Sequence, residues 1–221
     1  PKLSESNTLG AALEIPYFKV ITDNKDLTFK PRLYADGSTI LQSEYREERK
    51  NSSHILDFSI FSKINLDTLN DNDKKNHFFS NSIFDYDTKK YDSSKIEVNI
   101  ETSSNPTYLK TYKIESPLIK DQTSLNSFVN IEMNNEDTYL KTSFESYEDL
   151  TKNKNEKYEF IYPNIELVKQ IGLSSEYNGT LTFDLNGYQK EYGADSSDSV
   201  LINNLKYQSY DYFLDNGLKN K

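Results

Sequence analysis

Alternation of apolar and polar residues is the feature that most limits what this chain can fold into. At residues 27–33, Leu, Phe, Pro and Leu occupy every second position, and Thr, Lys and Arg lie between them. Residues 96–100 and 181–185 repeat the pattern with Ile, Val, Leu and Phe. Because successive side chains of a β-strand point to opposite faces, this period of two predicts strands with one apolar and one polar face.

The same pattern recurs along the whole chain. Seventeen Tyr and twelve Phe supply residues that favour strands, and Asp36-Gly37 is typical of a tight hairpin turn. The nearest candidate for an amphipathic helix, at residues 163–173, is confined by Pro163 and Gly172. We therefore predict an all-β antiparallel meander of about eleven strands. The expected strands span residues 11–21, 26–35, 38–48, 53–64, 76–86, 95–103, 123–134, 137–147, 156–168, 178–191 and 198–213.

Composition narrows the possible functions. The net charge of −9 counts against nucleic-acid binding, which requires a basic surface. No run of apolar residues is long enough for a transmembrane helix, but the strands of a membrane barrel need only about 9–11 residues each. A mean hydropathy of −0.80 favours a soluble protein. The pattern alone therefore leaves a soluble β protein and a membrane barrel open.

Residues that could support catalysis are sparse. His54 and His77 lie in separate predicted strands, so a metal site with three or four ligands is not expected. The acidic residues Glu44, Glu47 and Glu48 are interpreted as a charged rim at a strand end. The sequence contains no glycine-rich phosphate loop and no nucleophile elbow. We expect no enzymatic activity, no metal and no cofactor.

The first fifty residues carry a more specific pattern. The matching residues are Pro16-Tyr17-Phe18, Asp26 to Pro31, Gly37 and Glu44-Tyr45-Arg46. This order resembles the start of the barrel in the lipopolysaccharide-assembly protein LptD family, also called OstA or Imp. A weaker likeness continues to about residue 215, where a D-x-x-Y-L-x-x-Y segment of the family corresponds to residues 105–112. Asn105 replaces the family's Asp there.

The resemblance implies a fold. The family forms an antiparallel outer-membrane barrel of about twenty-six strands, of which this chain would supply about eleven as a transmembrane β-barrel fragment. Residues 1–12 would be the exit from a periplasmic jelly-roll domain, and residues 13–221 the partial barrel. We expect an open curved sheet. Its convex, lipid-facing side is expected to carry Leu27, Phe29, Leu33, Ile96, Val98, Ile100, Leu181 and Phe183.

The resemblance also implies a function without bond chemistry, the insertion of lipopolysaccharide into the outer leaflet of the outer membrane. Implied partners are lipopolysaccharide, the lipoprotein LptE inside the barrel and the periplasmic bridge protein LptA. The barrel would open laterally between its first and last strands. Pro16 and Pro31 would form part of this lateral gate, because proline cannot donate a ladder hydrogen bond. Alternatively, both prolines only shape the barrel.

Two other classes of function stay open. One is a different outer-membrane barrel, such as a porin or a receptor, in which the paired-proline opening is not expected. The other is a soluble β-rich surface or fibre protein. Both share the alternating pattern, so the two prolines and the residues around them are what favour the lipopolysaccharide transporter.

Overall fold

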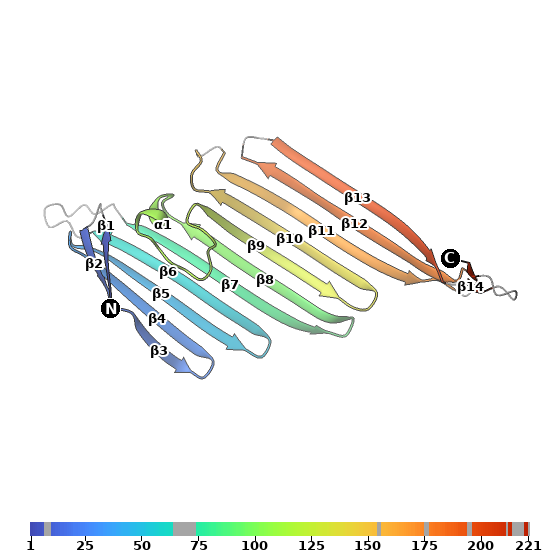
Figure 1. The fold of residues 1–221 in the computed structure, drawn as a ribbon, viewed down its shortest axis with the longest axis horizontal. Coiled ribbons are helices and arrows are strands. Elements are labelled where there is room, and N and C mark those ends of the chain that lie inside the picture. Colours follow the sequence, from blue (N-terminus) through green and yellow to red (C-terminus); the bar gives the residue numbers. More distant parts are fainter. Residues whose placement is uncertain are drawn as a thin grey trace. The chain divides into compact units, whose positions relative to one another are not determined.

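The described part of the protein is all β apart from one short helix. The computed structural model describes residues 1–6, 10–63, 74–153, 156–174, 177–193, 196–210, 212–213 and 219–220. Thirteen strands form one antiparallel sheet in the order β1-β2-β4-β5-β6-β7-β8-β9-β10-β11-β12-β13, and β3 also pairs with β4 (Figure 1). Nearly all neighbours in the sheet are consecutive in the chain, as the meander predicts.

The strand bounds follow the alternating segments closely. The strands are β1 (Lys2–Ser6), β2 (Gly10–Glu14), β3 (Tyr17–Thr22), β4 (Lys25–Tyr34), β5 (Ser38–Arg49), β6 (Ser52–Lys63), β7 (Lys75–Thr88), β8 (Tyr91–Ser103), β9 (Ser124–Asn134), β10 (Thr138–Asp149), β11 (Tyr158–Gly172), β12 (Gly179–Tyr192) and β13 (Ser196–Ser209). Two-residue strands β14 (Tyr212–Phe213) and β15 (Lys219–Asn220) pair separately. In the described residues, no helix is long and apolar enough to span a membrane.

The chain divides into two compact units. The first comprises residues 1–84, 97–128 and 146–158, and the second comprises residues 85–96, 129–145 and 159–221. In the second unit β12 pairs with both β11 and β13, and Gly187 lies inside β12 opposite Ile165 and Leu201. Leu181 and Phe183, two positions apart on β12, share one face of this unit.

In the first unit the register separates two kinds of side chain. Residues directly opposite each other share a face, so Pro31, Leu41 and Ile60 lie side by side across β4, β5 and β6. We call this the apolar face, although small polar side chains lie between its larger members and Lys25, Glu47 and His54 lie at one end of it. Its large side chains are Leu27, Phe29, Pro31, Leu33, Leu41, Tyr45, Leu56, Phe58, Ile60 and Phe78. Leu33, Leu41, Phe58, Ile60 and Phe78 are 38–50% exposed.

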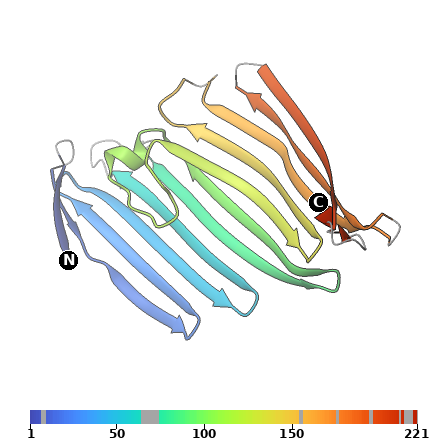
Figure 2. The same ribbon diagram turned by 45° about the vertical axis from the view of Figure 1, so that its right-hand side comes forward.

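The opposite face of the first unit, called the polar face, is partly covered by chain. Residues 104–123, called the cover segment, contain the helix α1 (Tyr108–Thr111) and lie in front of the strands of the first unit (Figure 2). Tyr108, Leu109 and Ile114 are completely buried. They pack with side chains of the polar face into one hydrophobic cluster, which contains Ala12, Tyr34, Ile40, Phe61, Phe79, Tyr108, Leu109, Tyr112, Ile114, Leu125 and Leu150.

The sequence did not predict two of these features. Strand β1 lies in the segment expected as a linker and pairs with β2, and α1 lies in a segment expected as a loop. The strand expected over residues 156–168 is confirmed as β11, which also takes in most of the weak helical periodicity at 163–173. There the cross-strand pairing with β12 outweighs that periodicity.

Candidate functional site

The first candidate site is the edge strand, which we define as β2 and β3 together. Both parts pair with β4 in one continuous register, since Glu14 lies opposite Arg32 and Tyr17 opposite Phe29. Between them lies Pro16, which has no N–H to donate. The break in the pairing with β4 reflects the missing N–H of Pro31, opposite Ile15, and not a change of register.

The second proline removes a bond at the same place. The backbone N–H of Ile15 donates to the carbonyl of Pro31 at 3.1 Å. In an antiparallel ladder such a pair normally exchanges two bonds, so the lost donor of Pro31 is the one that would face Ile15. Backbone donors alternate in direction along a strand, so the lost donor of Pro16 faces away from β4. Each proline thus weakens a different side of the edge strand.

The free side of the edge strand is only partly covered. Strand β1 pairs with β2 from Lys2 opposite Glu14 to Ser6 opposite Gly10. Among the described residues, β3 has β4 as its only strand partner. Tyr17 and Phe18, expected from the family pattern, are 62% and 54% exposed. They point to opposite faces, because Tyr17 lies opposite Phe29 and Phe18 opposite Thr28.

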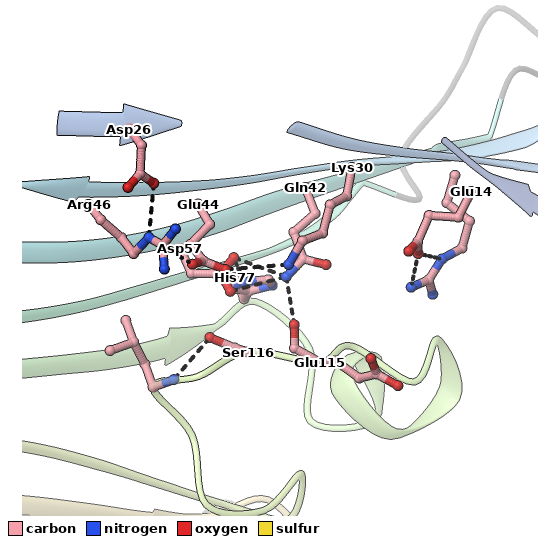
Figure 3. A network of polar contacts seen from close by, with 12 residues as sticks. Glu14, Asp26, Lys30, Gln42, Glu44, Arg46, Asp57, His77, Glu115 and Ser116 are labelled. Carbon is pink, nitrogen blue, oxygen red and sulfur yellow. Dashed lines mark hydrogen bonds and ion pairs between the residues drawn. The ribbon is translucent and has the colours of Figure 1, made fainter. Parts of the chain in front are cut away.

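Three further residues of the family pattern meet on the polar face. Asp26 lies directly opposite Arg46, and the Arg46 Nε–H donates to the Asp26 carboxylate at 2.9 Å (Figure 3). Glu44 lies 3.7 Å from Arg46 and 3.4 Å from Lys30. The Lys30–Glu44 pair links β4 to β5 in the middle of the two strands, and the Asp26–Arg46 pair links them at the end away from their connecting turn. Asp26 and Arg46 also line a pocket of about 430 Å³.

Tyr45 and Gly37 do not join that network. Tyr45 lies on the apolar face, where its hydroxyl donates to Glu47 at 2.8 Å. Gly37 lies in the turn between β4 and β5 with φ +84°, a conformation that favours glycine. Asp36 in the same turn accepts hydrogen bonds from the backbone N–H and hydroxyl of Ser38. Although burial opposes ionisation, these bonds lower the pKa of the Asp36 carboxyl.

A buried hydrogen-bond chain beneath the cover segment was not predicted. The Ser59 Oγ lies 2.6 Å from His77 Nδ1. On the other side of the ring, His77 Nε2 lies 3.2 Å from Asp57, and Figure 3 shows these two residues side by side. The Tyr108 hydroxyl lies 2.6 Å from Ser59 Oγ. Gln42 donates to both oxygens of Asp57 at 3.1 Å. These residues become neighbours only through the register of the strands and because the cover segment folds back over them. The pattern within a single strand therefore does not predict their contacts.

The order Ser, His and Asp is also that of a hydrolytic triad, but the surroundings differ. Ser59 and Asp57 have no exposed surface, and His77 is only 2% exposed. In the tautomer in which His77 Nε2–H donates to Asp57, Nδ1 accepts from Ser59, and Ser59 accepts from Tyr108. Burial raises the pKa of the Tyr108 hydroxyl to about 12, so this proton stays on Tyr108 at neutral pH. This hydrogen-bond chain is enclosed, and it holds the cover segment in place.

The described residues contain no group of three or more His, Asp or Glu side chains placed to hold a metal ion. The imidazole of His54 lies between the hydroxyls of Ser82 and Ser52, away from His77. No protein-family model matches the chain, and no similar curated protein is found.

Proposed function

We propose that this chain forms the first strands of an outer-membrane β-barrel that delivers lipopolysaccharide to the outer leaflet. The family pattern at Pro16-Tyr17-Phe18 and downstream suggests the transporter, and the two-faced sheet of the first unit is the observation that carries the proposal. In this proposal the apolar face contacts lipid and the polar face lines the interior.

The dimensions of the apolar face suit a bilayer. From Leu27 to Leu33 a strand rises about 20 Å, and the lipid-facing band of an outer-membrane barrel is about 25 Å tall. On the same face, two residues before Leu27 in β4, the Lys25 ammonium pairs with the Glu47 carboxylate of β5 at 3.1 Å. A charged pair at that position suits the boundary between hydrocarbon and water.

The edge strand suits a lateral opening. The chain's strand β3 would face the last strand of the completed barrel, and the lost donor of Pro16 would face that seam. A seam with fewer ladder bonds parts at lower free-energy cost. Through such an opening the acyl chains of the glycolipid could reach the bilayer while its sugars stay in the polar interior. A lipoprotein such as LptE would occupy that interior, and a bridge protein such as LptA would supply the glycolipid.

The membrane orientation can be tested by single-cysteine labelling, because the chain has no native cysteine. Leu41→Cys places a fluorophore on the apolar face of β5, and Arg46→Cys places it on the polar face of the same strand. In the complete protein reconstituted in lipid, brominated acyl chains should quench the label at position 41 and spare position 46. Aqueous iodide should show the reverse preference.

A second measurement separates the candidate functions. Depleting the complete protein in cells should lower surface lipopolysaccharide while other outer-membrane barrels remain assembled. Quenching by lipid without loss of surface lipopolysaccharide would instead identify a different outer-membrane barrel. If brominated lipid quenches neither position, the chain is not a membrane barrel, and the soluble surface or fibre protein is the better reading.

A further inference from the structure

Arg32 joins the edge strand to the cover segment. Its Nε–H and Nη2–H both donate to the Glu14 carboxylate of β2, at 2.9 and 2.7 Å. Its Nη1–H donates to the backbone carbonyl of Tyr112 at 2.6 Å. The side chains of Arg32 and Glu14 are only 12% and 13% exposed. One partly desolvated guanidinium therefore holds both segments at once, a geometry that suits the planar fork of arginine.

Strand β2 depends on such a contact because its backbone pairing with β4 is short. The paired residues run from Ala12 to Glu14, and single backbone bonds at Ala11 and Ile15 flank them next to the break at Pro16. Ala12 is 2% exposed and belongs to the same hydrophobic cluster as Tyr112. Removing the cover segment would therefore expose Ala12 and leave the Arg32–Glu14 pair in water, where such pairs are worth little.

The cover segment is itself anchored farther from the edge. The Tyr108 hydroxyl contacts Ser59 on β6, and Gln42 on β5 donates to the carbonyl of Glu115 at 2.9 Å. A further ion pair, between Lys2 of β1 and Glu115 at 3.5 Å, has both side chains well exposed. The anchors on β5 and β6 are thus linked through the cover segment and Arg32 to the edge strand.

We propose that the cover segment is a clasp for the edge strand, with Arg32 as the positioning residue that couples them. Docking of the segment on the polar face holds β2 against β4, and its release loosens β2. The next step rests on the proposed function, in which the edge strand is the transport seam. A molecule in the polar interior that displaces the cover segment then makes the seam easier to open. The coupling itself requires no transport activity.

Amide hydrogen exchange of the full chain in detergent micelles tests the coupling. Arg32→Gln should speed exchange about tenfold or more both at residues 10–14 and at residues 108–114. Lys30→Gln is the matched control, because Lys30 lies on the same strand and face but pairs with Glu44 of β5. It should leave both regions within about twofold of the unchanged chain.

Two further variants separate coupling from a local ion pair. Arg32→Lys keeps the charge but cannot bond both partners, so it should loosen both regions as Arg32→Gln does. Tyr108→Phe removes only the bond to Ser59, yet it should also speed exchange at residues 10–14. If Arg32→Lys behaves as the unchanged chain, or if Tyr108→Phe loosens the cover segment alone, the clasp is refuted. Amide hydrogen exchange is measured without glycolipid. Its result therefore tests the coupling even if the proposed transport function is wrong.

Discussion

Replacing Pro16 by Ala should strengthen the seam of the completed barrel and slow glycolipid delivery. The replacement restores one N–H that points away from β4, at the first edge position that β1 does not cover. One regained ladder bond is worth about 1 kcal/mol, which shifts an open–closed equilibrium about fivefold. Surface lipopolysaccharide per assembled barrel should therefore accumulate up to about fivefold more slowly.

Pro31→Ala provides an internal comparison. Its restored N–H faces Ile15 within the chain, so it should slow amide exchange of the edge strand even in the chain alone. Pro16→Ala should leave that exchange unchanged. A double replacement of Ile96 and Val98 by Ala controls for effects on barrel abundance. If Pro16→Ala delivers glycolipid at the parental rate at equal abundance, the prolines only shape the sheet and the gate assignment is wrong.

Three further predictions concern the fold. Phe61→Ala should lower the free energy of unfolding by about 3–5 kcal/mol, since Phe61 is 1% exposed, whereas Phe58→Ala on the apolar face should cost far less in denaturant titration. The Tyr108 pKa of about 12 exceeds the value of about 10 in an unfolded chain. The contribution of Tyr108 to the free energy of unfolding is therefore complete below about pH 10 and is lost as the pH rises to about 12. Tyr108→Phe should abolish that alkaline loss, measured by circular dichroism. Gly37→Ala should cost about 1 kcal/mol in unfolding titrations, because only the positive φ opposes it.

The sheet could be predicted from sequence because its strands depend on a local pattern. Alternation located β4 to β13 within a few residues, and it identified Gly187 as a strand residue. The register of β4 with β5 brings Asp26, Glu44 and Arg46 together on one face. In these cases the sequence signal and the structural feature lie on the same or adjacent strands.

The buried hydrogen-bond chain could not be predicted in the same way. Ser59 and His77 become neighbours only through the register of β6 with β7. Tyr108 reaches them only because the cover segment folds back over the polar face. His77 was interpreted as an ordinary strand residue, and nothing in its neighbouring residues distinguishes it from His54. The role of Arg32 depends on a backbone carbonyl, which carries no residue-specific signal at all.

The placing of Lys30 and Arg32 on one face of β4, and of Phe29 and Pro31 on the other, has a consequence for assembly errors. If β4 were displaced by one residue against β5, Lys30 and Arg32 would move to the side now held by Phe29 and Pro31. The three ion pairs between β4 and β5, Lys25–Glu47, Lys30–Glu44 and Asp26–Arg46, would be lost together, and in the proposed membrane barrel charged groups would meet hydrocarbon. In the proposed membrane barrel, the bilayer itself would therefore select against sheets in which β4 and β5 are misaligned.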